Sequence, residues 1–116
     1  MKKTEMLKKN YQFKKVLSKG KFYKEKAIEI VILKNNKNIN LLGIAIGTKN
    51  GKAFQRNKAK RIIRECYKIL EEQLVEGNSI VILIKKEFNL KDINFNSIFE
   101  EMKNCFEKAK IVKKEE

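Results

Sequence analysis

The segment that most restricts how this chain can fold is residues 79–85, which read Ser-Ile-Val-Ile-Leu-Ile-Lys. Successive side chains of a β-strand point to opposite faces of the sheet, so a strand here is apolar on both faces. Strands of this kind lie inside a sheet that is covered on both sides. We therefore predict a central, buried strand at residues 79–85.

Two more strands are predicted upstream, at residues 27–33 and 39–47. The first is rich in isoleucine and valine, and its even-numbered isoleucines project to one face. Residues 35–38, Asn-Asn-Lys-Asn, have the composition of a turn. We expect the two strands to pair with each other as a hairpin.

Apolar residues at helical spacing predict helices at residues 8–18, 53–74 and 97–109. Asn10 and Ser97 are candidate start signals, Ser97 as part of a capping box. The predicted order is α-β-β-α-β-α in an α+β fold. At 116 residues the chain is too short for two full cores, so we expect a single domain over residues 1–116, with flexible ends at 1–6 and 111–116.

The charge is concentrated in two blocks. The chain has 28 Lys plus Arg against 14 Asp plus Glu, a net charge of +14. Residues 1–26 hold ten lysines against two glutamates, and residues 49–68 hold eight basic residues against Glu65 alone. All three arginines lie in the second block, where their planar side chains suit phosphate. This distribution indicates a polyanionic partner, such as a nucleic acid.

The second block lies on the predicted helix at 53–74, which has two opposite stripes. At about 100° per residue, one stripe is apolar and the other polar and cationic. The apolar stripe consists of Ala59, Ile63, Cys66 and Leu70, and the cationic stripe of Asn57, Arg61, Arg64 and Lys68. An ordinary solvated helix face carries acids four residues from its bases, and between residues 53 and 68 only Glu65 does so. Binding to a polyanion is therefore favoured over a plain surface.

The first block mixes lysines with aromatic residues, including Tyr11, Phe13, Phe22 and Tyr23. Aromatic rings among cations are typical of proteins that bind single-stranded nucleic acid, because unpaired bases stack on the rings. Equally, Phe13 and its neighbours at helical spacing, such as Leu17, can dock the first helix on the sheet. The spacing alone does not separate these two interpretations.

No catalytic or metal-binding motif is recognisable. The chain has no histidine, and its carboxylate pairs at 71–72 and 100–101 are expected to be surface residues. Cys66 and Cys105 follow no zinc or disulfide pattern and are expected in the core. The longest apolar run, residues 27–33, is too short to cross a membrane. Charged residues occupy the place of a signal peptide's apolar stretch, so a cytoplasmic protein is expected.

Two stretches resemble a known family. Residues 51–65 read Gly-Lys-Ala-Phe-Gln-Arg-Asn-Lys-Ala-Lys-Arg-Ile-Ile-Arg-Glu, which resembles the G-x-A-V-x-R-N-R-x-K-R-x-x-R signature of the bacterial ribonuclease P protein subunit. Residues 7–20 resemble that family's basic first helix, which opens L-K-K and has a phenylalanine at position 13. The resemblance covers about residues 7–110.

The resemblance implies the protein part of an endoribonuclease whose catalytic component is RNA. The implied partners are this catalytic RNA and precursor tRNA, whose 5′ leader is removed, rather than DNA or a membrane. Catalytic residues and metal ligands are not expected on the protein, and Mg²⁺ is expected to be held mainly by the RNA. The implied fold is an α/β sandwich with a mixed sheet and a left-handed β-α-β crossover, although general rules favour a right-handed one.

The resemblance also implies which residues bind. Arg56, Asn57, Lys60, Arg61 and Arg64 match motif residues that contact the catalytic RNA, and the expected set is completed by Lys52, Lys58 and Lys68. Lys58 stands where the motif has arginine, which keeps the charge but not the bidentate geometry. Phe13 and the sheet face that includes Val31 match the cleft for the single-stranded leader. The expected leader-binding residues are Lys9, Phe13, Leu17 and Val31.

Two other functions compete with this one. A ribosomal or other structured-RNA-binding protein without a processing role would use the same cationic helix but would need no leader cleft. A basic amphipathic membrane-surface binder is disfavoured, because the predicted strands indicate a folded core.

Overall fold

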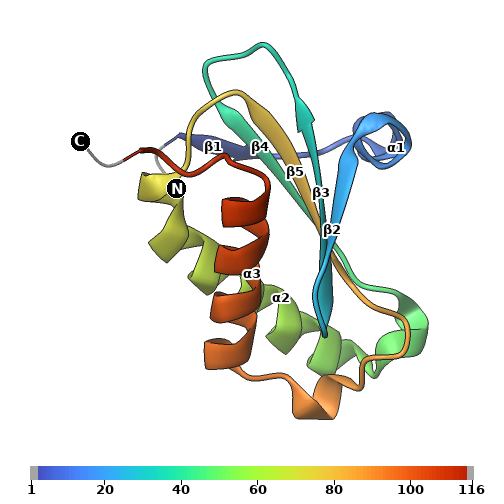
Figure 1. The fold of residues 1–116 in the computed structure, drawn as a ribbon. Helices are drawn as coiled ribbons and strands as arrows, with labels where there is room; N and C mark the ends of the chain where they lie inside the picture. Colours follow the sequence, from blue (N-terminus) through green and yellow to red (C-terminus); the bar gives the residue numbers. More distant parts are fainter. Residues whose placement is uncertain (1–2, 115–116) are drawn as a thin grey trace.

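The middle layer of the molecule is a five-stranded mixed sheet with the strand order β1-β4-β5-β3-β2 (Figure 1). This computed structural model describes residues 3–114. The strands are β1 (Thr4–Met6), β2 (Lys21–Lys24), β3 (Ile28–Lys34), β4 (Asn40–Ala45) and β5 (Asn78–Ile84). The most apolar strand, β5, is central as predicted, since it pairs with β3 on one side and with β4 on the other.

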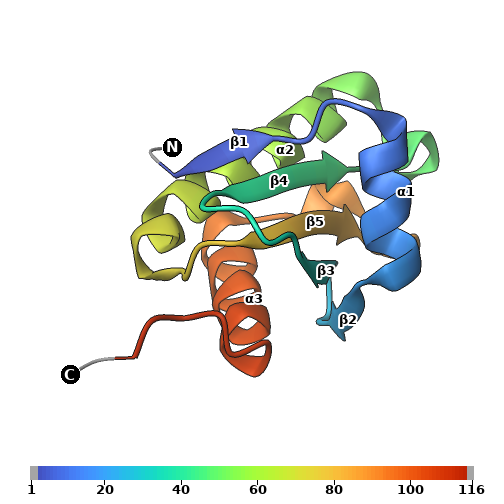
Figure 2. The same ribbon diagram turned by 90° about the horizontal axis from the view of Figure 1, so that it is seen from above.

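Helices cover both faces of this sheet. They are α1 (Asn10–Lys19), α2 (Ala53–Leu70) and α3 (Phe95–Lys108), with short 3-10 turns η1 (Thr48–Asn50), η2 (Glu71–Gln73) and η3 (Leu90–Asp92). Figures 1 and 2 show α1 on one face and α2 with α3 on the other. The predicted α/β sandwich and the three helices are confirmed.

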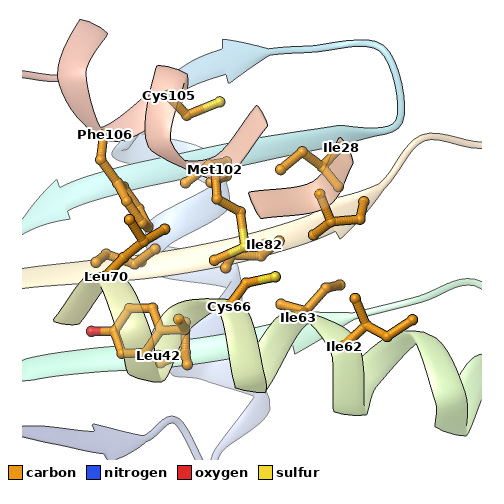
Figure 3. Close-up of a cluster of buried hydrophobic side chains, with 14 of the residues drawn as sticks. Ile28, Leu42, Ile62, Ile63, Cys66, Leu70, Ile82, Met102, Cys105 and Phe106 are labelled. Atoms are coloured by element: carbon orange, nitrogen blue, oxygen red, sulfur yellow. The ribbon is translucent and has the colours of Figure 1, made fainter. Parts of the chain in front are cut away.

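The two sides of the sheet have separate cores. On β3, Ile28, Ile30 and Ile32 belong to the larger core under α2 and α3, whereas Val31 belongs to the smaller core under α1. Figure 3 shows side chains of α2, α3 and β5 meeting in the larger core. Alternation along one strand thus supplies apolar residues to both layers.

The predicted hairpin between the second and third segments is wrong. β3 pairs antiparallel with β5 and β2, whereas β4 pairs parallel with β5 and β1. The connection after β3 crosses the start of β5, where the Asn35 N–H donates to the Gly77 carbonyl at 2.9 Å. β5 therefore lies between β3 and β4, the two strands of the predicted hairpin. Because β5 is apolar on both faces, this central position buries it most completely.

Two edge strands, β1 and β2, were not predicted. They have three and four residues, and in β2 three of the four are exposed. Strands this short lack the apolar alternation that identifies a strand, and β2 also begins and ends with lysine. β1 also shows that the N-terminal end is part of the fold from Thr4 onward, and Val112 forms a bridge with Leu74, so the flexible ends expected at 1–6 and 111–116 do not extend this far inward. Residues 1–2 and 115–116 lie outside the described residues.

Helix boundaries differ slightly from those predicted. α1 is capped by Lys9 rather than Asn10, and α2 ends at Leu70, where a 3-10 turn continues the chain. The capping box at Ser97 is wrong, because Asn94 caps α3 and its Oδ1 accepts from the Ser97 N–H at 2.9 Å. None of the helices within residues 3–114 is long and apolar enough to cross a membrane.

The parallel neighbours β4 and β5 are joined through α2. In Figure 2 both strands run in the same direction, and α2 lies behind the sheet, on the side away from α1. The path from β4 behind the sheet to β5 is left-handed, as the resemblance implied and against the general rule. This crossover places the arginine-bearing helix on the face opposite α1.

Candidate nucleic-acid interface

The cationic stripe of α2 is exposed along its whole length. We call Asn57, Lys58, Arg61, Arg64 and Lys68 the α2 cationic face, and all five side chains are exposed. The predicted apolar stripe on the other side of the helix is buried, from Ala59 to Leu70. The amphipathic interpretation of this helix is therefore confirmed, and its packing against the core fixes the direction in which the cations point.

Apart from Lys68, which lines a cavity with Glu71, Glu72 and Glu76, the cations of this face have few acidic neighbours. Within residues 3–114, the ion pairs are Lys3 with Glu76, Lys85 with Glu87, and Lys108 with Glu25, and none of them involves α2. Glu65 is the only acid in the helix sequence. Like charges on one helix face repel by a few tenths of a kcal/mol per pair, and a bound polyanion removes that repulsion.

The N-terminal end of α2 is held firmly by hydrogen bonds. Arg56 Nη1 donates to the carbonyls of Gly51 at 2.8 Å and Thr48 at 3.2 Å. The Lys52 N–H donates to Gln55 Oε1 at 2.8 Å, and Asn50 Nδ2 donates to the Lys85 carbonyl at 3.0 Å. Arg56 is thus partly a structural residue, because its Nη1 bonds to the loop that precedes the helix. Of the remaining predicted residues here, Lys52 is exposed and Lys60 half-buried.

Phe13 has features of both interpretations of the first block, docking of α1 on the sheet and contact with a nucleic acid. Its ring packs on Gly43 of β4 so closely that an added Cβ there would be 2.5 Å from Phe13 Cε1. Phe13 and Leu17 both pack against the smaller core, yet both side chains stay partly exposed. The docking interpretation is therefore correct, and part of each side chain is still available to a ligand. Lys9 is exposed at the start of α1.

Val31 is fully buried, with 0% of its surface exposed. It packs in the core beneath α1, so its side chain offers no surface to a leader. We therefore correct its expected role from direct contact to support of the residues above it. This burial follows from the position of Val31 in the middle of β3, next to the central strand.

Phe22 was left out of the expected leader-binding residues, although it lies on the same sheet face as Val31. The two residues are directly paired across β2 and β3, and paired residues of antiparallel strands share a face. Phe22 is 43% exposed. The sequence shows that aromatic residues alternate with lysines here. It does not show to which face of the sheet Phe22 points, because that depends on β2, which was not predicted.

α1 and the start of α2 are at the same end of the molecule. Figure 2 shows α1 and the start of α2 toward the end to which the β4 and β5 arrows point, and Figure 1 shows the two helices on opposite faces of the sheet. The aromatic residues of α1 and the pinned start of α2 therefore lie toward the same end of the sheet but on opposite faces. The rest of α2, with Arg64 and Lys68, runs back toward the other end.

The two cysteines and two of the carboxylates are structural. Burial, helped by the charge of Glu65, raises the pKa of Cys66 to about 11, and burial also raises the pKa of Cys105 to about 12. Both thiols are free and in the core, as expected.

The surface role expected for the carboxylates is wrong for Glu71, which is buried, and for Glu101, whose Oε1 accepts from the Ala27 N–H at 2.8 Å. Among the described residues, no group of three or more His, Cys, Asp or Glu side chains is arranged to hold a metal ion.

Comparison with known proteins gives consistent matches over nearly the whole chain. A family model described as Ribonuclease P matches residues 1–110. The Ribonuclease P protein component of Natranaerobius thermophilus is 32% identical over 108 residues, which cover 93% of this chain and 92% of the relative. The component from Dictyoglomus turgidum is 35% identical over 112 residues, which cover 97% and 94%.

Solved structures agree with these relatives. The RNase P protein of Staphylococcus aureus superposes with a TM-score of 0.79 at 28% identity, covering 93% of this chain and 97% of the other. The RNase P protein from Thermotoga maritima gives a TM-score of 0.80 at 26% identity, covering 90% and 96%. Both similarities extend over the sheet and the helices on its two faces.

Proposed function

This chain belongs to the ribonuclease P protein family, and we propose how its surfaces contribute to ribonuclease P. It is the protein subunit of ribonuclease P, the endoribonuclease that removes the 5′ leader of precursor tRNA. We propose that the α2 cationic face, together with Lys52, Arg56 and Lys60, binds the catalytic RNA. The observation that supports this proposal is that five basic or amide side chains line one exposed helix face, and that no ion pair within residues 3–114 involves them.

The proposed leader-binding residues lie near α1. Phe13 and Leu17 keep part of their side chains exposed, Lys9 is exposed at the start of the helix, and Phe22 adds an aromatic ring on the same side of the sheet. Rings with exposed faces can stack on the bases of a single strand while lysines neutralise its phosphates. Val31 supports this surface from below.

We propose that the RNA carries out the hydrolysis and holds most of the Mg²⁺. Mg²⁺ prefers hard oxygen ligands and binds substrates largely through phosphates and water. A strongly cationic protein surface repels such ions, so the phosphates of the RNA are the better ligands. The protein's part is to neutralise RNA charge and to position the leader, and the reaction takes place in the cytoplasm, where a bacterium keeps its tRNA precursors.

The test is cleavage of precursor tRNA by the cognate catalytic RNA at low Mg²⁺ concentration, with and without the protein. We expect added protein to increase the cleavage rate and the affinity for precursor tRNA, because its cations replace Mg²⁺ in neutralising phosphate repulsion. A matched control is Lys103→Ala, which removes an exposed charge from α3 and is expected to behave as the parent. RNA binding without any change in cleavage is what a structured-RNA-binding protein with no processing role would give, and it would contradict the proposal.

A further inference from the structure

Phe54 is a large apolar side chain in an unusual place. It is the second residue of α2 and is 68% exposed, although most of the apolar side chains of this helix are buried. A single exposed apolar residue is common on protein surfaces. An exposed aromatic ring among cations is different, because it combines the two groups that bind unpaired nucleotides.

The ring points in the same direction as the α2 cationic face. At about 100° per residue, Phe54, Lys58 and Arg61 lie within about 60° of one another around the helix axis. Both cations are exposed. Phe54 therefore heads the line of cations at the N-terminal end of the helix.

The backbone under the ring is well ordered by its own hydrogen bonds. Arg56 and Gln55, the two residues after Phe54, bond to the chain segment that precedes the helix. Asn50 ties this segment to the carbonyl of Lys85 beyond β5. A ring on such a support loses little freedom when a flat ligand stacks on it, which favours binding.

We propose that Phe54 stacks on an unpaired base of the catalytic RNA, with Lys58 and Arg61 contacting phosphates beside that base. This inference rests on the proposed function and adds to it a contact that is not electrostatic. The G-x-A-V signature that residues 51–65 resemble has valine at this position, whereas this chain has Phe54. RNA is favoured over a protein partner because the surroundings of the ring are cationic.

The first experiment measures the affinity of the cognate catalytic RNA for three proteins across a series of salt concentrations. Phe54→Leu keeps an apolar side chain without a ring, and Phe54→Tyr keeps the ring. We expect Phe54→Leu to weaken binding about fivefold or more, since stacking on one base has an effect of this order. We expect Phe54→Tyr to bind within about twofold of the parent, and both variants to keep the parent's salt dependence, because every phosphate contact is kept.

Three results would overturn the inference: parental affinity for Phe54→Leu, equal weakening of both variants, or a reduced salt slope for Phe54→Leu. Because the side chain of Phe54 is exposed, both variants are expected to melt at the parent's temperature. A lower melting temperature would reveal an effect on folding. Arg61→Ala separates this inference from the proposed function. If Arg61→Ala leaves RNA binding and its salt slope unchanged, the proposed role of the α2 cationic face fails whatever Phe54 does.

The second experiment detects stacking directly. The chain contains no tryptophan, so Phe54→Trp introduces a single tryptophan, whose fluorescence can be excited separately from that of the three tyrosines. A base stacked on the indole quenches its fluorescence, and we expect strong quenching on titration with the catalytic RNA. The matched control is Ile69→Trp, at a position of the same helix that is 56% exposed and about 22 Å further along its axis. Equal quenching at both positions, or none at Phe54→Trp, would contradict the inference.

Discussion

Phe13 both packs and faces outward. One part of its ring lies against Gly43, where even a methyl group would collide with it, and another part is exposed. The same side chain can therefore stabilise the core and contact a bound leader. The two contributions can be separated by measuring stability and substrate preference in the same variants.

We predict that Phe13→Ala weakens precursor tRNA binding by the holoenzyme about fivefold more than mature tRNA binding, because only the precursor has leader bases to stack on the ring. Poorer packing should also lower the free energy of unfolding by about 2 kcal/mol. The control is Val16→Ala on the same helix, a residue only 3% exposed, which should lower stability without changing the preference for precursor. If Phe13→Ala weakens both tRNAs equally, the ring serves the core alone.

The buried thiols predict a specific response to alkaline pH. Burial raises the pKa of Cys66 to about 11 from an ordinary value of 9.0, and the pKa of Cys105 to about 12. In the unfolded chain both thiols ionise near pH 9, whereas in the folded protein they stay protonated. Their contribution to stability is therefore complete below pH 9 and is lost as pH rises through 9 to 12.

We accordingly expect the denaturant midpoint to fall between pH 9 and pH 11, and to fall less in the double variant Cys66→Ala, Cys105→Ala. Tyr67, whose pKa burial raises to about 12, should account for part of the remaining fall. Native thiols should also react slowly with iodoacetamide at pH 8. The same fall in parent and double variant would show that the cysteines do not contribute.

Among the elements, α2 combines residues with different roles on one helix. Arg56 is half-buried and bonded to the loop before it, whereas Arg61 and Arg64 are exposed. The sequence motif treats these arginines alike. Their environments indicate that mutation will separate them.

We predict that Arg61→Ala and Arg64→Ala each weaken binding to the catalytic RNA and reduce the slope of log affinity against log salt by about one unit for each phosphate that is no longer neutralised. Their thermal stability should be unchanged. Arg56→Ala should weaken RNA binding and also lower the free energy of unfolding by about 1 kcal/mol, because the Gly51 and Thr48 carbonyls then lack this donor. An unchanged salt slope for Arg61→Ala and Arg64→Ala would show that these residues do not contact phosphate.

An element could be predicted from the sequence where the pattern of apolar residues within its own segment identified it. α2 was predictable because its 18 residues with a helical period leave little alternative, and β5 because it is apolar on both faces. β2 carries no such signal, so the face on which Phe22 lies was hidden. The predicted hairpin failed because β5, which follows both of its strands in the chain, is inserted between them.

At the scale of the whole molecule, the N-terminal strand β1 links the sheet to α2, and its removal tests how much this link stabilises the fold. β1 pairs in parallel with β4 and forms an edge of the sheet. The hydroxyl groups of Thr4 on β1 and Tyr67 on α2 share a buried hydrogen bond of 2.8 Å. β1 thus joins the sheet to the arginine-bearing helix.

Deletion of residues 1–6 is predicted to lower the free energy of unfolding by about 3 kcal/mol, since several backbone hydrogen bonds are removed together with the buried partner of the Tyr67 hydroxyl. The measurement is a urea titration followed by circular dichroism. Thr4→Val is the matched control, because it removes only the bond to Tyr67 and should cost about 1 kcal/mol. A midpoint that does not move on deletion would mean that β1 is not a stable part of the fold.

The central strand, the amphipathic helix and the separation of charge into two blocks could be predicted from the order of residues, because each depends on a short stretch of chain. Family resemblance added the partner RNA and the crossover hand. Tertiary contacts place β5 between β3 and β4, cover Val31, bond Arg56 to its own loop and leave the ring of Phe54 exposed. These depend on contacts between residues far apart in sequence, and periodicity within one segment carries no information about which distant segment will cover it.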